Sequence, residues 1–214
     1  MICLKKLQGL YLIVDPAMPH NKLLGIVEDA LKGGVDILQL WAHRQHRYAI
    51  PKMAKILLGL ATEYNVPLII NNDLELAKET DAHGLHMDRY DVTPAEIRKI
   101  LGKQSIVGYT IGNNLEKLKW AEAVGADYVS FCAVFPTSSV TTCEIVPLNS
   151  VRLAKSTTDL QVFASGGINL GNAHLVLEAG ADGIAVISAI LKARYPEKAA
   201  RSFKDIIYKY GPQT

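Results

Sequence analysis

The strongest constraint on the fold is a short pattern that recurs along the chain: a helical stretch, a glycine and then an apolar run. It occurs as EDALKGGVDILQLW at 28–41, AEAVGADYVSFCAV at 121–134 and VLEAGADGIAVISA at 176–189, with a weaker copy in ELAKETDAHGLHMD. The glycine is typical of a helix C-terminus, and the apolar run is typical of a parallel strand that is covered on both faces. The recurrence therefore indicates a fold built from repeated helix–strand units.

Eight segments have the character of strands. They lie at 9–15, 36–41, 67–72, 84–88, 106–111, 128–134, 162–168 and 183–189. Helical patterns separate most of them, among them 49–65, 93–102 and 115–125. Eight strands alternating with helices predict a compact α/β fold, a (β/α)8 barrel in a single domain over 1–214, with a doubly wound open sheet as the alternative. In a barrel, functional residues lie where strands end, so these positions supply the candidates.

Composition narrows the expected partners. The formal net charge is +2, so the overall charge does not point to nucleic acid or to an anionic membrane. No run approaches the roughly 18 apolar residues of a membrane helix, and the N-terminal residues lack the apolar stretch of a signal peptide. Cys3, Cys132 and Cys143 are too few and too scattered for a disulfide framework or a zinc site. We therefore expect a cytoplasmic protein without a nucleic-acid or membrane partner, and a homodimer stays open.

The stretch FASGGINLGN at 163–172 places two glycines between a predicted strand and a predicted helix. A tight turn is the simplest interpretation. The alternative is a phosphate site, because Gly166 and Gly167 would let an anion approach unpaired backbone N–H groups closely. Phosphate sites in barrels commonly use the loops after the seventh and eighth strands, and the second of these contains Ser188. The sequence therefore predicts a phosphate site between these two loops.

Five segments, in this order, resemble thiamine phosphate synthase and its relative, the TenI-type thiazole tautomerase. They are VPLIINNDLELA, HGLHM, GADYVSFCAVFPT, SGGI and GADGIAVISAI, and the resemblance covers nearly the whole chain. It implies a (β/α)8 barrel that joins hydroxymethylpyrimidine pyrophosphate to thiazole phosphate and releases pyrophosphate with the help of Mg²⁺. It also implies that the thiazole phosphate is held by Gly166, Gly167, Ile187 and Ser188.

The same resemblance implies where the substrates bind. Gln39 corresponds to the residue that contacts the pyrimidine, and the further substrate-binding candidates are Trp41, Asn71, Thr137 and Ser139. The catalytic group is not assigned, and the candidates for it are Thr110, Ser139 and His86. The expected partner is therefore a small phosphorylated thiazole or pyrimidine.

Several positions depart from the synthase pattern. Trp41 stands where the synthases carry arginine, and His43 and Val140 stand where they carry lysine. Because such cations stabilise the charge that develops on the leaving pyrophosphate, their loss predicts weak binding of that group. Arginines nearby in the sequence could compensate, namely Arg44, Arg47 and Arg89.

Mg²⁺ is the cofactor that the resemblance implies, with a weakened site. Asp91 matches one metal-binding carboxylate of the synthases, whereas Asn72 replaces the other with an amide. A hard cation prefers anionic oxygen, so a site with one carboxylate should bind Mg²⁺ less tightly. Asn72→Asp is therefore expected to tighten it.

Three functional classes follow. The first is a thiamine phosphate synthase, a transferase with reduced or altered activity. The second is a tautomerase-like isomerase, but that branch relies on a histidine where this chain has Ala133, so it would need another base such as His86. The third is a binder of a phosphorylated heteroaromatic ligand without turnover.

Overall fold

The computed structural model describes residues 7–41, 50–137 and 144–212. Within these ranges, eight parallel strands pair in chain order, and β8 pairs with β1 to close the barrel. The strands are β1 Gly9–Val14, β2 Ile37–Leu40, β3 Leu68–Asn71, β4 Gly84–Met87, β5 Ile106–Thr110, β6 Tyr128–Phe131, β7 Gln161–Ser165 and β8 Gly183–Val186. The closure confirms the predicted (β/α)8 barrel and excludes the open sheet.

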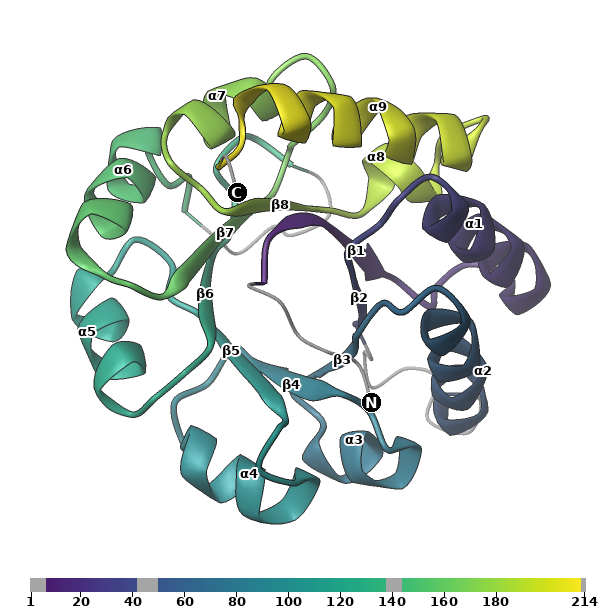
Figure 1. Ribbon diagram of the computed structural model, residues 1–214, viewed down its shortest axis with the longest axis horizontal. Helices are drawn as coiled ribbons and strands as arrows, with labels where there is room; N and C mark the ends of the chain where they lie inside the picture. The colour runs from purple at the N-terminus through teal and green to yellow at the C-terminus, as the bar shows by residue number, and fades with distance from the viewer. Residues whose placement is uncertain (1–6, 42–49, 138–143, 213–214) are drawn as a thin grey trace.

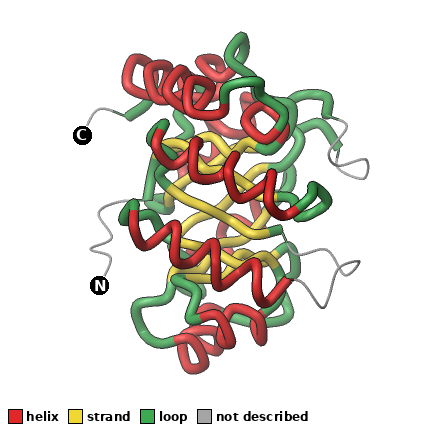
Figure 2. The backbone as a smooth tube through the Cα atoms, turned by 90° about the vertical axis from the view of Figure 1, so that its right-hand side faces the viewer, coloured by secondary structure: helices red, strands yellow, loops and turns green. Residues whose placement is uncertain are grey.

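Helices surround the ring of strands (Figure 1). They are α1 His20–Lys32, α2 Ile50–Glu63, α3 Leu74–Thr80, α4 Pro94–Leu101, α5 Leu115–Ala123, α6 Leu148–Thr157, α7 Ala173–Glu178, α8 Ser188–Leu191 and α9 Pro196–Tyr210. Figure 2 shows the barrel from the side, with the strands enclosed between helices. None of the described helices combines the length and the apolar composition needed to cross a membrane.

Three strands, β6, β7 and β8, end three residues before the predicted segments do, because the backbone turns there. The run at 128–134 leaves the sheet after Phe131, and Ala133 has a left-handed φ of 57°. The run at 183–189 leaves the sheet after Val186, and Ser188 already begins α8. The chain after β6 and after β8 therefore turns instead of extending the sheet.

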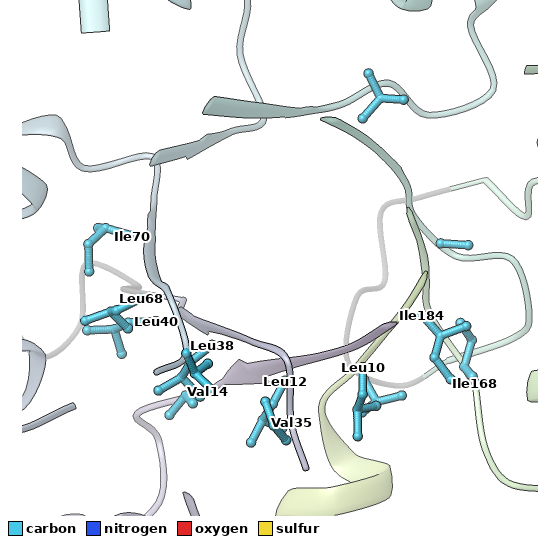
Figure 3. Close-up of a cluster of buried hydrophobic side chains, with 14 of the residues drawn as sticks. Leu10, Leu12, Val14, Val35, Leu38, Leu40, Leu68, Ile70, Ile168 and Ile184 are labelled. Carbon is cyan, nitrogen blue, oxygen red and sulfur yellow. The ribbon is translucent and has the colours of Figure 1, made fainter. Parts of the chain in front are cut away.

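Side chains alternate between the two faces of the barrel wall, as the period of two along a strand requires. Leu10, Leu12, Leu38 and Leu40 point outward and belong to the layer between strands and helices (Figure 3). A second, smaller cluster fills the interior, with Tyr11, Ile37, Ile69, Ile106, Tyr128, Phe163 and Ala185. The last inward positions of β2 to β7 carry polar side chains, whereas those of β1 and β8 are Ile13 and Ala185. The interior therefore becomes more polar toward the carboxyl ends of the strands.

The recurring pattern has a structural role at the opposite end of the barrel. In three of its copies an aspartate lies two residues after the glycine. Its carboxylate accepts a hydrogen bond from a backbone N–H of the neighbouring strand and another from a lysine or arginine on a helix. Asp36 pairs with Leu10 and Lys204, Asp127 with Val107 and Arg98, and Asp182 with Val162 and Lys155. In (β/α)8 barrels this amino-terminal end of the strands contributes to stability, and active sites lie at the carboxyl ends. The repeat therefore explains the fold, and the functional site is expected at the opposite end.

Candidate functional site

A cavity of about 1420 Å³ lies at the carboxyl ends of the strands. Turns that follow β7 and β8 form one part of its lining, with Gly166, Gly167, Ile187 and Ser188. Polar side chains near the ends of β2 to β7 form another part, with Gln39, Asn71, His86, Thr110, Ser130 and Ser165. The barrel thus brings together most of the residues that the sequence nominates.

The turn after β7 needs both of its glycines. Gly166 and Gly167 have φ values of 92° and 67°, a region that disfavours other residues. A Cβ on Gly166 would lie 2.5 Å from the nitrogen of Ala133, and one on Gly167 would lie 2.5 Å from the carbonyl oxygen of Pro136. Among the described residues, the backbone N–H groups of Gly167 and Ser188 have no acceptor. These donors line the cavity and suit an anion, which supports the predicted phosphate site without testing it.

A chain of hydrogen bonds crosses the interior beneath the cavity. The Tyr11 hydroxyl donates to Gln39 Oε1 at 2.7 Å and lies 2.9 Å from the Tyr128 hydroxyl. The Tyr128 hydroxyl lies 2.9 Å from His86 Nδ1, and His86 Nε2 lies 2.8 Å from Thr110 Oγ1. Two sequence candidates, His86 and Thr110, are therefore in direct contact and are linked to Gln39 on the far side of the barrel.

Asp88 completes this chain, although the sequence did not identify it as a site residue. Its Oδ1 accepts a hydrogen bond from the Thr110 hydroxyl at 2.7 Å. Its Oδ2 accepts hydrogen bonds from the side-chain amide nitrogens of Asn71 at 3.2 Å and Asn72 at 2.6 Å. Its backbone N–H donates to Asn72 Oδ1 at 2.8 Å. Asp88 therefore engages both ends of the Asn72 amide.

The surroundings set the protonation of this chain. Burial lowers the pKa of His86, and the Asp88 carboxylate opposes this in part. Burial raises the pKa of Asp88, but the His86 ring and the hydrogen bonds that it accepts outweigh burial, so its pKa is lowered overall. Burial also raises the pKa of Tyr11 and of Tyr128. At neutral pH the site thus holds an ionised aspartate, protonated tyrosines and a histidine with one ring proton.

Asn72 and Asp91, the residues nominated for Mg²⁺, have other partners in the structure. Both polar atoms of the Asn72 amide are bonded to Asp88, and Asp91 is absent from the cavity lining, with its carboxylate 3.8 Å from Arg89 Nη1. The described ranges include every Asp and Glu of the chain, and within them no group of three or more His, Cys, Asp or Glu could hold a metal ion. The arrangement does not fit Mg²⁺ bound by Asn72 and Asp91.

Asn72→Asp is expected to create the missing site at a cost in stability. Asn72 has a left-handed φ of 56°, which aspartate tolerates, so the change acts through charge. The new carboxylate would face that of Asp88, where the amide nitrogen now lies at 2.6 Å, and like charges repel at this distance. We expect the free energy of unfolding at pH 7 without metal to fall by about 1–2 kcal/mol. Millimolar Mg²⁺ should restore it, as thermal unfolding with and without Mg²⁺ would show.

Asn65→Asp is the matched control, since Asn65 is exposed and has a similar φ of 55°. It should show neither the loss of stability nor the response to Mg²⁺. An Asn72→Asp protein as stable as wild type and indifferent to Mg²⁺ would show that the two side chains do not share a site in solution.

The remaining candidates lie as follows. Trp41 comes directly after β2, and it lines the cavity together with Thr137 and Arg89. Lys192 also lines the cavity and was not predicted, because it follows the short helix α8 that the sequence did not reveal. Residues outside the described ranges are His43, Arg44, Arg47, Ser139 and Val140.

Comparison with known proteins identifies the family. The family model described as thiamine monophosphate synthase matches residues 10–190. A thiamine-phosphate synthase from Methanobrevibacter smithii is 33% identical over 194 residues, which cover 91% of this chain and 92% of that protein. One from Desulfitobacterium hafniense is 38% identical over 201 residues, covering 92% and 96%. The solved thiamine phosphate pyrophosphorylase from Pyrococcus furiosus superposes with a TM-score of 0.82 at 29% identity, covering 95% of this chain and 96% of that one. The chain therefore belongs to the thiamine monophosphate synthase family.

Proposed function

We propose that this protein is a thiamine phosphate synthase, a transferase that couples hydroxymethylpyrimidine pyrophosphate to thiazole phosphate. The observation that carries the proposal is that one cavity is lined by both the glycine turns and the polar strand ends. Its volume of about 1420 Å³ exceeds the roughly 300–1,000 Å³ typical of a pocket for one small ligand. It suits two substrates side by side, as a coupling reaction requires, whereas an isomerase needs room for one.

The two parts of the cavity suit the two substrates. The turns at Gly167 and Ser188 offer backbone N–H donors to the thiazole phosphate. Lys192, which follows Ser188 closely in the sequence, also lines the cavity and carries a positive charge. The pyrimidine would lie at Gln39 and Asn71, on the inward face of β2 and β3. Its methylene carbon would then face the thiazole nitrogen, which forms the new bond as the bond to the pyrophosphate oxygen breaks.

The site has few positive charges to stabilise the departing pyrophosphate. The cationic side chains that line the cavity within the described ranges are those of Arg89 and Lys192. Trp41 replaces an arginine of the resembled pattern and supplies no charge. The Mg²⁺ expected from the resemblance stays a prediction, because no group of three or more His, Cys, Asp or Glu in the described ranges could hold it. We therefore propose a synthase that holds its pyrophosphate substrate weakly.

The test is a coupling assay with both precursors and Mg²⁺, and the product is detected as a fluorescent thiochrome after oxidation. We expect thiamine phosphate to form only when both precursors are present, with a high KM for the pyrimidine pyrophosphate. NMR of the thiazole phosphate in the same mixture covers the isomerase alternative. Isomerisation of the thiazole without any coupling would overturn the proposal in favour of the tautomerase branch, where His86 is the one cavity-lining histidine within the described ranges.

A further inference from the structure

The hydrogen-bond chain from Asp88 to Gln39 has a direction, because each hydroxyl in it carries a single proton. At one end, the ionised Asp88 can only accept, so Thr110 donates its proton to Asp88 Oδ1. Thr110 Oγ1 must then accept from its other neighbour, His86 Nε2, at 2.8 Å. The ring proton of a neutral His86 therefore lies on Nε2, and Asp88 fixes this tautomer.

The tautomer determines the rest of the chain. With its proton on Nε2, His86 accepts at Nδ1 from Tyr128, and Tyr128 accepts in turn from Tyr11. Tyr11 has then used its proton and must accept from Gln39. The amide of Gln39 would present its NH2 group to Tyr11 and its carbonyl oxygen to the cavity.

The Gln39 amide has the opposite orientation in the structure. There Tyr11 donates to Gln39 Oε1, and Gln39 Nε2 has no hydrogen-bond partner among the described residues. With this orientation an unbroken chain would need N–H groups at both ring nitrogens of His86. Burial lowers the pKa of His86 from 6.5, so its second proton is lost by neutral pH. The Gln39 amide then turns by half a rotation about its terminal bond, a torsion with a broad two-fold preference.

We propose that Asp88 is a positioning residue that fixes the tautomer of His86 and, through Tyr128 and Tyr11, selects the end of the Gln39 amide that faces the ligand. At neutral pH this end is the carbonyl oxygen, so Gln39 selects a ring that offers it an N–H donor. The choice of a pyrimidine as that ring rests on the proposed function, whereas the tautomer does not.

Asp88→Asn is the informative substitution because it keeps the shape of the side chain and reverses the direction in which the hydrogen bonds of the chain are donated. The introduced amide can accept from Asn71 and Asn72 with its oxygen and donate to Thr110 with its nitrogen. Thr110 then gives its proton to His86 Nε2, and the ring proton moves to Nδ1. Tyr128 and Tyr11 reverse in turn, and Gln39 presents its NH2 group to the cavity.

The first arm of the experiment reads the tautomer without any ligand. NMR of ¹⁵N-histidine protein at neutral pH resolves the two ring nitrogens through their two-bond couplings, and a His86→Gln sample assigns His86 among the 6 histidines. We expect an Nε2–H ring in wild type and an Nδ1–H ring in Asp88→Asn. Asp91→Asn is the matched control, because it removes the same charge outside the cavity lining and should leave the tautomer unchanged. The same tautomer in wild type and in Asp88→Asn would overturn the proposal.

The second arm reads the ligand preference. The 4-aminopyrimidine alcohol and its 4-oxo analogue exchange donor for acceptor along one edge, so their ratio of Kd values reports the end of Gln39 that they meet. We expect this ratio to shift by about tenfold in Asp88→Asn relative to wild type. With Tyr128→Phe in both proteins the chain is interrupted, so Asp88→Asn should still move the tautomer but no longer the ratio. A shift that persists in the Tyr128→Phe background would show that Asp88 acts on the ligand by another route.

These outcomes are separate from those of the coupling assay. A protein that fails to make thiamine phosphate but shows the tautomer exchange would refute the proposed function and leave the role of Asp88 intact. If Asp88→Asn does not fold, Asp88→Ala removes the acceptor of Thr110 together with the carboxylate that lies 3.7 Å from His86 Nε2. It should release the preference for Nε2–H, and an unchanged tautomer in that variant would equally overturn the proposal.

Discussion

Gly167→Ala should weaken the binding of thiazole phosphate by about a hundredfold, while the barrel stays folded. The added Cβ would lie 2.5 Å from the Pro136 carbonyl oxygen and 2.8 Å from Phe135 Cβ, at a φ of 67°. The turn after β7 has to move, and a shift of about 1 Å in positioned groups is enough for such a loss. The strain should also lower the free energy of unfolding by about 1–3 kcal/mol. Calorimetric titration with thiazole phosphate, combined with circular dichroism, measures both effects.

Gly59→Ala serves as the control for this experiment. Gly59 lies on α2, where a Cβ would have open space, so that protein should bind thiazole phosphate like wild type. Its stability should rise by up to about 1 kcal/mol, because alanine favours a helix. Unchanged phosphate binding in a folded Gly167→Ala protein would place the phosphate elsewhere in the cavity.

The fold could be predicted because each helix–strand unit carries its own pattern. The apolar runs, the glycines after the helices and the regular alternation are local features, and their number led directly to a closed barrel. The aspartates of the repeat were visible too, but their role was not. Asp182, for example, accepts from Val162, a residue 20 positions away, and only the pairing of β7 with β8 brings the two together.

The site was predicted less completely, because it depends on contacts between neighbouring strands. The register of β3 with β4 places Asn71 opposite His86, and this brings Asp88 beside Asn72. Nothing in the local sequence shows that Asp88 would turn toward Asn72 while Asp91 lies near Arg89. The metal residues therefore stay a prediction from the resemblance, because in the structure Asn72 bonds to Asp88 and Asp91 lies near Arg89.

The interior tyrosines were missed for a different reason. In the sequence, Tyr11 and Tyr128 lie within apolar runs and look like ordinary core residues. The period-two alternation was the signal that could have separated them, since both occupy inward positions. Gly108 gives a second signal, because a Cβ there would lie 2.1 Å from the Tyr128 ring, so glycine makes room for the phenol. A buried hydroxyl needs partners, and these are the polar groups of the site.

Trp41→Arg should tighten the binding of hydroxymethylpyrimidine pyrophosphate by about ten- to a hundredfold. Trp41 follows β2 directly and lines the cavity, so an arginine there would bring a guanidinium to the ligand. Charge-assisted hydrogen bonds to phosphate contribute about 1.5–3 kcal/mol, and an indole offers only one neutral N–H donor. The unphosphorylated pyrimidine alcohol should gain nothing, and thiazole phosphate should bind as before at the glycine turns. Calorimetric titration of the three ligands at two salt concentrations measures these differences.

Trp41→Leu separates charge from the loss of the ring. If the indole only fills the mouth of the cavity, Trp41→Leu and Trp41→Arg should improve pyrophosphate binding to the same extent, and salt should have no effect. If the missing charge limits the site, only the arginine should improve binding, and the gain should shrink as salt screens it. Tight binding of the pyrimidine pyrophosphate to wild type itself would contradict the premise. The cation would then have to come from a side chain such as Arg89, whose replacement by methionine should abolish that binding.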